Sequence, residues 1–384
     1  MSPDPLVGAH PVTPVLLVIG TRPEAIKMLP VVRALRHVPE VDLKVVTTGQ
    51  HRQMLDQVFA VFDERADIDL DLMTPGQTLS DITARVMREM EGLIAQHRPG
   101  LVLVHGDTTS AMAAALAAFY ARVPVGHVEA GLRSHDIMRP WPEEYNRVSI
   151  DAVAELLWAP TAGAAQNLRN ERDCERRIEV TGNTGIDALL HVAERLTGDE
   201  LAGLPVNLDP AKKLVLVTGH RRESFGEGFG RICEALKAIA ARGDAQIVYP
   251  VHLNPQVKDV VEARLGDCAD VHLIAPVDYL QMVALMKAAH LVLTDSGGIQ
   301  EEAPALGKPV LVMRDVTERP EAVETGVATL VGTDVDAIVR GVCQLLSDDA
   351  LYASRARPVF PYGDGTAAEK IAASVAAFVK ASAR

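Results

Sequence analysis

The chain has 384 residues, and at about 150 residues per domain this length predicts two domains, each able to bury its own core. It carries 38 basic and 51 acidic residues, for a net charge of −13. This acidic balance excludes a nucleic-acid partner bound without sequence preference, because such binding needs a basic face.

Cysteine usage and apolar runs predict a soluble cytoplasmic protein without a membrane partner. The four cysteines are scattered and form no Cys-x-x-Cys pair, so neither a disulfide framework nor a zinc site is expected. Residues 1–14 lack the charged and apolar regions of a secretory signal. The longest apolar run, Ala111–Ala121, is far shorter than a membrane span.

Short β-branched runs alternate with amphipathic helical stretches along the chain. In the first half, the predicted strands are Val15–Ile19, Leu43–Thr47, Leu101–His105, Val123–Val128, Leu156–Ala159 and Ile178–Val180. In the second half, they are Leu214–Thr218, Ala245–Pro250, Val271–Ile274, Leu291–Asp295, Pro309–Met313 and Thr329–Val331. Apolar runs of this length are typical of parallel strands covered on both faces. The pattern predicts an α/β protein with two Rossmann-like, doubly wound domains.

The two series of strands set the expected domain boundaries. We expect an N-terminal domain over residues 1–184, a C-terminal domain over 185–364, and a C-terminal helix within 365–384 that packs back towards the N-terminal domain. Residues 197–210 are rich in Gly, Pro and Asp and are expected to form a loop. Pro30 lies within the first amphipathic stretch and is expected to kink that helix or to shorten its first turn.

Ligands of open α/β sheets bind at the carboxyl ends of the strands. The first strand is followed by Gly20-Thr21-Arg22-Pro23-Glu24, where Arg22 could clamp phosphate oxygens beside a helix start. The alternative is an ordinary turn with a surface Arg–Glu pair.

Two motifs of the second half also favour an anion. Ser296-Gly297-Gly298 opens a helix, and its N–H groups and hydroxyl suit a diphosphate, whereas the alternative is that Ser296 only caps the helix. His220, Arg221 and Arg222 suit a pyrophosphate leaving group or, alternatively, form a solvated basic loop.

Carboxylates gather in the first half. Asp107 and Glu129 each follow a buried-looking strand, and Glu143 lies in Pro-Trp-Pro-Glu-Glu (140–144). Clustered carboxylates raise one another's pKa, which permits acid and base catalysis near neutral pH. The alternatives are a helix cap at Asp107 and a divalent metal site.

Several missing motifs narrow the class of reaction. No Gly-x-Gly-x-x-Gly follows a strand, and neither Tyr-x-x-x-Lys, a P-loop nor Gly-x-Ser-x-Gly occurs. These absences weigh against a nicotinamide enzyme, an ATPase and a serine hydrolase of that type.

Eight collinear motifs between Val15 and Gly365 resemble those of the non-hydrolysing UDP-N-acetylglucosamine 2-epimerases. They are Gly-Thr-Arg-Pro-Glu-Ala-Ile-Lys (20–27), Gly-Gln-His-Arg-Gln-Met-Leu-Asp-Gln (49–57), His-Gly-Asp-Thr-Thr (105–109), His-Val-Glu-Ala-Gly-Leu-Arg (127–133), Pro-Trp-Pro-Glu-Glu (140–144), Thr-Gly-His-Arg-Arg-Glu-Ser-Phe-Gly (218–226), Asp-Ser-Gly-Gly-Ile-Gln-Glu-Glu (295–302) and Glu-Arg-Pro-Glu (318–321). The resemblance implies a glycosyltransferase-B arrangement of two Rossmann-like domains, with the active site in the cleft between them. It implies reversible conversion of UDP-GlcNAc to UDP-ManNAc, without NAD, another cofactor or an essential metal. The family eliminates UDP to a 2-acetamidoglucal and adds it back, and it supplies surface polysaccharide precursors.

The same resemblance implies roles for single residues. The catalytic set is Asp107, Glu129, Glu143 and His220. The substrate-binding set is Arg22, Lys27, Arg139, His220, Ser296, Gly297, Gly298, Glu302 and Arg319, with Lys27 positioning a carboxylate, Glu302 holding the ribose and Arg319 at the sugar end. A second, activating substrate site of some members is matched by Gln50, His51, Gln53 and His252, although Gly76 replaces an arginine found in some of them. UDP-GlcNAc, UDP-ManNAc and UDP are the implied ligands, and the resemblance also implies a homodimer.

The acidic net charge is compatible with these anionic ligands. Seven cationic side chains lie in motifs expected near one cleft: Arg22, Arg133, Arg139, His220, Arg221, Arg222 and Arg319. The alternatives to the epimerase are a hydrolysing relative that releases ManNAc and UDP, a glycosyltransferase of the same fold, and a nucleotide-sugar sensor without activity.

Overall fold

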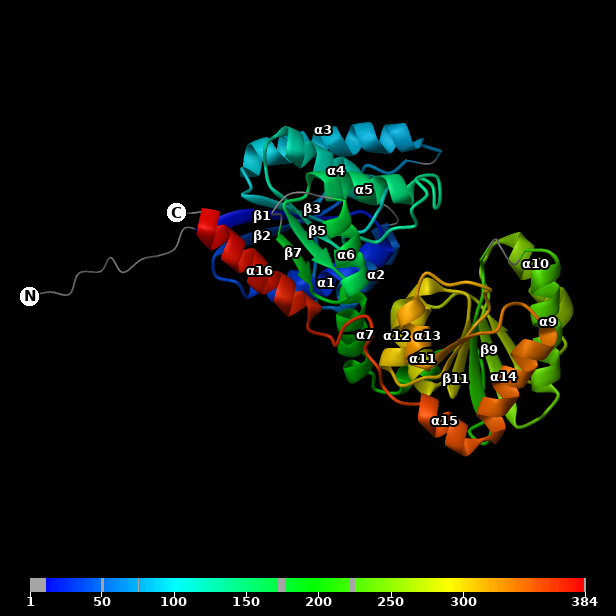
Figure 1. Ribbon diagram of the computed structural model, residues 1–384. Coiled ribbons are helices and arrows are strands. Elements are labelled where there is room, and N and C mark those ends of the chain that lie inside the picture. Colours follow the sequence, from blue (N-terminus) through cyan, green and yellow to red (C-terminus); the bar gives the residue numbers. More distant parts are fainter. Residues whose placement is uncertain (1–11, 50–51, 75, 172–176, 222–224, 383–384) are drawn as a thin grey trace, which may run out of the picture. The chain divides into compact units, whose positions relative to one another are not determined.

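The computed structural model describes residues 12–49, 52–74, 76–171, 177–221 and 225–382, without the side chains of 52–54. Contacts divide the chain into two compact units, one formed by residues 1–188 with 363–384 and the other by 189–362 (Figure 1). These divisions lie close to residues 184 and 364, where the sequence analysis placed the domain boundaries.

The first unit is built on a seven-stranded parallel sheet in the order β3-β2-β1-β4-β5-β6-β7. Its strands are β1 (Thr13–Ile19), β2 (Val41–Thr47), β3 (Ile68–Asp69), β4 (Leu101–His105), β5 (Val125–Val128), β6 (Leu156–Ala159) and β7 (Arg177–Val180). Its helices are α1 (Arg22–Arg36), α2 (Arg52–Val61), α3 (Leu79–His97), α4 (Thr109–Tyr120), α5 (Glu143–Val153), α6 (Ala162–Asn170), the first residues of α7 (Thr184–Arg195) and α16 (Ala367–Ser382).

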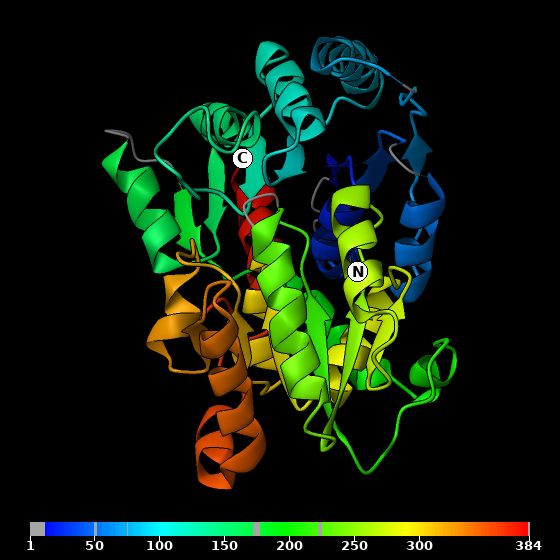
Figure 2. The ribbon, with the colours of Figure 1, turned by 90° about the vertical axis from the view of Figure 1, so that its right-hand side faces the viewer.

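Helices α3 and α4 pack side by side over this sheet, and the buried alanines of α4 permit the close approach (Figures 1 and 2). Helix α16 returns from the end of the chain and packs against α1. Helix α1 begins at a capping box, in which the Thr21 hydroxyl and the Glu24 carboxylate each accept a backbone N–H of the other residue. It then continues through Pro30, and the flanking Leu29 and Val31 are fully buried in the core.

The second unit holds a six-stranded parallel sheet in the order β10-β9-β8-β11-β12-β13. Its strands are β8 (Lys213–Thr218), β9 (Ala245–Pro250), β10 (Val271–Ile274), β11 (Leu291–Thr294), β12 (Val310–Val312) and β13 (Ala328–Leu330). Its helices, beside the end of α7, are α8 (Asp199–Ala202), α9 (Glu227–Ala240), α10 (Pro255–Leu265), α11 (Tyr279–Ala288), α12 (Gly297–Ala305), α13 (Pro320–Glu324), α14 (Val335–Ser347) and α15 (Asp349–Arg355).

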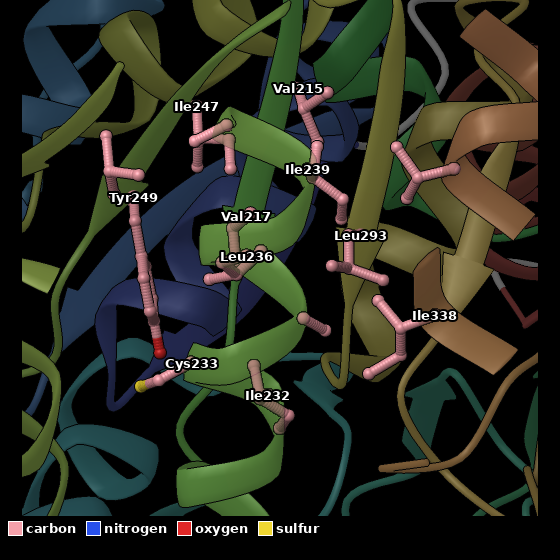
Figure 3. Packing of buried hydrophobic residues seen from close by; sticks show 14 of the residues in the cluster. Val215, Val217, Ile232, Cys233, Leu236, Ile239, Ile247, Tyr249, Leu293 and Ile338 are labelled. Carbon is pink, nitrogen blue, oxygen red and sulfur yellow. The ribbon is translucent and has the colours of Figure 1, made fainter. Parts of the chain in front are cut away.

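The core of this unit forms where α9 covers one face of the sheet (Figure 3). Ile232 and Leu236 of α9 pack among Val217 of β8, Tyr249 of β9 and Leu293 of β11, and all five side chains are buried. Burying aliphatic side chains stabilises the fold by roughly 1.5–3 kcal/mol each, so this layer holds the strand ends of β8 and β11 in place.

The predicted α/β class with two parallel sheets is confirmed, and each predicted strand lies within two residues of an observed one. Two details differ. The predicted loop over residues 197–210 contains the short helix α8, and β3, of only two residues, was not predicted. Among the cysteines, Cys233, Cys268 and Cys343 are free thiols, while Cys174 lies outside the described residues.

Candidate functional site

The first polar cluster lies at the carboxyl ends of three neighbouring strands. In the sheet order, β4 lies between β1 and β5, so the loops after these strands share one edge. Lys27 lies on the helix after β1, Asp107 follows β4, and Glu129 follows β5. The structure therefore brings these three predicted site residues together at the edge where α/β proteins bind ligands.

Glu129 is held by a cation, an amide and a strained backbone. Lys27 Nζ forms an ion pair with Glu129 Oε1, and Asn183 Nδ2 donates to the same oxygen at 3.5 Å. Glu129 has a φ of +69°, a left-handed conformation that a non-glycine residue adopts only where its surroundings impose it. The ion pair and the backbone together aim this carboxylate in one direction.

A buried histidine that was not predicted lies beside this carboxylate. His105 Nε2 is 3.8 Å from Glu129 Oε2, and neither ring nitrogen has a hydrogen-bond partner among the described residues. Burial lowers the pKa of His105 to about 3, so the ring is neutral. Its only sequence signal was its place at the end of a buried strand, directly before Gly106-Asp107.

Asp107 is held by Arg147 of α5, which also lies 3.2 Å from Glu144 Oε2. Burial raises the pKa of Asp107, and the charge of Arg147 opposes this shift. The alternative that Asp107 caps the following helix is wrong. Thr108 is the N-cap of α4, and its hydroxyl accepts the N–H of Ala111 at 3.1 Å.

The two adjacent glutamates at the start of α5 have different surroundings. Glu143, the predicted catalytic residue, is half-buried, and its carboxylate has no hydrogen bond or ion pair to another described residue. Glu144 was not predicted, although it is buried and accepts the N–H groups of Ser134 and His135 at 2.9 and 3.2 Å. In the sequence, the spacing of three residues between Glu144 and Arg147 on a helix was the signal that could have indicated their ion pair.

Glu24 joins two of these loops. It is 3% exposed and accepts the N–H of Gly20 at 3.1 Å, the N–H of Thr21 at 2.5 Å and the hydroxyl of Thr108 at 2.8 Å. Burial raises the pKa of Glu24 to about 7. The alternative of a surface Arg22–Glu24 pair is therefore wrong. Within the described part of the chain, the guanidinium of Arg22 forms no hydrogen bond or ion pair, so it is available to a ligand.

Two predicted cations of this half, Arg133 and Arg139, have opposite exposures. Arg133 is wrong as a member of the anion-binding patch. Its side chain is 2% exposed and donates to Asp151 at 2.7 Å and to both carboxylate oxygens of Glu171 at 2.8 and 2.7 Å. Arg139 is 87% exposed, and its Nε lies 3.7 Å from Asp136 Oδ2.

The second polar cluster lies at the carboxyl ends of β8 and β11, which are neighbours in the second sheet. Asp295 is fully buried and accepts the backbone N–H groups of His220 and Arg221, both at 2.8 Å. The His220 ring stacks on His252 with 5.3 Å between ring centroids. Burial lowers the pKa of His220, while Asp295 opposes the shift, so the ring is neutral near pH 7.

The N-terminus of α12 is suited to an anion. Gly297 and Gly298 begin the helix, and Ser296 is its N-cap residue but makes no capping bond with its side chain. The alternative that Ser296 serves as a side-chain cap is therefore wrong. A Cβ atom at Gly297 would lie 3.7 Å from Arg221 NH2 and from Arg319 Cζ, so two guanidinium groups face the helix start. Free N–H groups and these cations attract the same ligand.

The remaining predicted residues are only partly described. Arg319 forms an ion pair with Glu301 of α12, and Glu302 is half-buried on the same helix. Gln50, His51 and Arg222 lie outside the described residues, as does the side chain of Gln53.

Within the ranges that the structure describes, no group of three or more His, Cys, Asp or Glu side chains is arranged to hold a metal ion. In those ranges, no group of side chains supports the alternative of a metal site. None of the described helices is long and apolar enough to cross a membrane.

The fold and the two clusters define a two-domain α/β protein of the glycosyltransferase-B class. A glycotransferase of kitacinnamycin has a TM-score of 0.62 over 95% of this chain and 99% of its own, at 14% identity, which shows the fold alone. Residues 33–376 match the family model described as UDP-N-acetylglucosamine 2-epimerase, and the chain belongs to that family.

Curated relatives and solved structures similar to this chain carry the same family name. The UDP-N-acetylglucosamine 2-epimerase of Escherichia coli strain K12 is 54% identical over 363 residues, which cover 93% of this chain and 96% of the relative. The crystal structure of the UDP-GlcNAc 2-epimerase from Neisseria meningitidis, bound to UDP-GlcNAc, has a TM-score of 0.87 at 43% identity and covers 94% of this chain and 99% of its own. The family expected from the motifs is thus confirmed as that of UDP-N-acetylglucosamine 2-epimerases.

Proposed function

We propose that the protein interconverts UDP-GlcNAc and UDP-ManNAc at C2 without hydrolysis. The observation that carries this proposal is the pairing of two carboxylates with two cations at one sheet edge, Glu129 with Lys27 and Asp107 with Arg147. A C2 epimerisation needs a base on one face of the sugar and an acid on the other, and these carboxylates provide two such groups.

The reaction begins with removal of the C2 proton by a carboxylate of the set Asp107, Glu129 and Glu143. The C2–H electron pair forms the C1=C2 double bond, and the C1–O electron pair leaves with UDP, which gives a 2-acetamidoglucal. UDP then adds back to C1 while C2 takes a proton on its other face. The raised pKa of Asp107 suits a group that must return a proton near neutral pH.

The second cluster supplies the diphosphate site in this proposal. Negative charge grows on the diphosphate as the C1–O bond breaks, so fixed donors at that position lower the barrier. The start of α12 offers such donors: the N–H groups of Gly297 and Gly298 and the Ser296 hydroxyl. The guanidinium of Arg319, which lies beside Gly297, is another. Neutral His220 adds a side chain that can donate or accept a hydrogen bond. Glu302, half-buried on the same helix, is proposed to hold the ribose hydroxyls.

The test is incubation of the pure protein with UDP-GlcNAc in D2O, followed by NMR. We expect deuterium at C2 and about a tenth of the sugar as UDP-ManNAc. This ratio corresponds to a free-energy difference of ~1.4 kcal/mol between the two epimers. Absence of exchange at C2 would overturn the proposal. Free ManNAc as the main product would instead identify a hydrolysing enzyme, and sugar transfer to an added acceptor would identify a glycosyltransferase.

We also propose that the enzyme works as a cytoplasmic homodimer and supplies surface polysaccharide precursors. Light scattering of the pure protein measures the oligomeric state. An activating second substrate site at Gln50, His51, Gln53 and His252 is a further proposal, supported by the stacking of His252 on His220. Initial rates that rise sigmoidally with UDP-GlcNAc and become hyperbolic in His252→Ala would support that site.

A further inference from the structure

A fully buried histidine lies between the two loops that carry the paired carboxylates. His127 of β5 has both ring nitrogens at hydrogen-bond distance from acceptors. Nε2 is 2.8 Å from the carbonyl oxygen of Gly106, and Nδ1 is 2.6 Å from Oδ1 of Asp151 on α5. Neither residue was among the predicted site residues.

The two acceptors determine what the ring must supply. A carbonyl oxygen can only accept a hydrogen bond, and so can an ionised carboxylate. Burial works against ionisation of Asp151, but His127 and Arg133 outweigh it and hold the pKa of Asp151 below its ordinary value. Each ring nitrogen of His127 thus faces an oxygen that can accept a hydrogen bond from it.

The same pair supports both catalytic loops. Gly106 has a φ of +65° and immediately precedes Asp107, while Gly131 has a φ of +85° and lies two residues after Glu129. The second oxygen of Asp151 accepts the Gly131 N–H at 3.1 Å. One side of the pair therefore holds the Asp107 loop through the Gly106 carbonyl, and the other holds the Glu129 loop through the Gly131 N–H.

Arg133 and Glu171 complete the network. Arg133 donates to Asp151 at 2.7 Å and forms two bonds to Glu171, whose side chain is 38% exposed, so the network runs from the interior to the surface. Buried ions need such partners, because an unpaired charge in the interior is strongly destabilising.

We propose that His127 and Asp151 form a positioning pair that sets the distance between the Asp107 and Glu129 carboxylates. This inference rests on the proposed epimerase function, because it assigns the pair to that reaction. Displacement of a reacting group by about 1 Å can lower the rate by roughly 10²-fold, so the pair is expected to act on kcat rather than on ligand binding.

Two amide substitutions separate the two hydrogen bonds. In His127→Gln, the longer side chain reaches the position of Nε2 and can still donate to the Gly106 carbonyl, whereas in His127→Asn the shorter side chain can donate only to Asp151. We expect His127→Asn to lower kcat for C2 exchange by roughly 10²-fold with KM within about twofold. His127→Gln should recover at least about tenfold of that loss. His272→Asn, which alters a half-buried histidine of β10 in the other unit, is the matched control and should leave kcat unchanged.

Two further measurements keep the positioning role separate from folding and from the proposed function. UDP affinity by calorimetry should be the same in all variants, because the proposed diphosphate donors lie in the second unit. The 15N chemical shifts of the wild-type His127 ring should show that both ring nitrogens take part in hydrogen bonds.

The outcomes are distinguishable. Suppose that the wild type is active. The positioning role alone would then be overturned if kcat in His127→Asn equalled that of the wild type, or if kcat in His127→Gln were no higher than in His127→Asn. Loss of UDP affinity together with kcat would also overturn it, because it would indicate general unfolding. A wild type without C2 exchange, but with both ring nitrogens of His127 in hydrogen bonds, would overturn the proposed function and the positioning role with it, while leaving the buried network intact.

Discussion

Lys27 and Glu129, which are 102 residues apart in the sequence, form an ion pair at the carboxyl edge of the first sheet. Lys27 comes from the helix after β1, and Glu129 follows β5, with β4 between the two strands. The pair therefore places one carboxylate and its counter-charge beside the Asp107 loop, and it is the basis of the first prediction.

Glu129→Gln should retain the fold and lose the reaction. Replacing a catalytic carboxylate by an amide removes its proton transfer, so we expect C2 deuterium exchange to fall by roughly 10²-fold or more. UDP affinity, measured by calorimetry, should stay within about threefold, because the proposed diphosphate donors are elsewhere. Glu89→Gln on the exposed face of α3 is the control. Unchanged exchange in the Glu129 variant would remove it from the catalytic set.

Substitutions at Asp107 and Thr108 should have separate effects, one on catalysis and the other on helix capping. Asp107→Asn should lower exchange by roughly 10²-fold while leaving the melting temperature close to that of the wild type. Thr108→Ala should lower stability by about 1–2 kcal/mol, because it removes the cap of α4 and the hydroxyl bound to Glu24. Thr108→Ser keeps both bonds and is the control. A stability loss in Asp107→Asn as large as that in Thr108→Ala would speak against this division of roles.

Glu24 should make stability depend on pH. Its pKa is raised from 4.5 to about 7 by burial, so between these values the folded state holds a proton that the unfolded state has lost. The stabilisation is complete below pH 4.5 and is lost as the pH rises through about 7.

Denaturant unfolding at pH 5 and pH 8 measures this effect. Between pH 5 and pH 8, the free energy of unfolding should fall more in the wild type than in Glu24→Gln. The pKa rise from 4.5 to about 7 sets the extra loss at up to ~3 kcal/mol. The exposed variant Glu89→Gln should follow the wild type. Parallel pH curves for the wild type and Glu24→Gln would contradict the assignment.

Gly298 offers a test of the anion site at the start of α12. No atom lies within 4 Å of a Cβ built at Gly298, so Gly298→Ala fits the fold, and it should stabilise the helix by up to about 1 kcal/mol. The methyl group would occupy space proposed for the diphosphate, so UDP affinity should fall by roughly tenfold or more.

Gly92→Ala on α3 is the matched control, since it also has no neighbour within 4 Å. It should stabilise the protein to a similar extent with unchanged UDP affinity. Equal UDP affinity in both alanine variants would place the diphosphate elsewhere.

The sequence was sufficient for the elements and for the family. Runs such as Leu101–His105 and Ala245–Pro250 are strands with the predicted bounds, because their continuous apolar character reflects burial on both faces. The glycines at 297 and 298 are a local signal, and helix α12 begins there. The order of the motifs along the chain predicted the family that the comparisons show.

Which charges are paired and which remain available depends on contacts between distant parts of the chain. Arg133 and Arg22 look alike in the sequence, yet the first is buried between Asp151 and Glu171, while the second forms no ion pair within the described residues. The physical reason is that local patterns encode strands, helices and caps, whereas burial and pairing depend on which strand ends become neighbours. Because β1, β4 and β5 adjoin, Lys27 meets Glu129 and His127 meets Gly106, and no spacing along the chain contains that information.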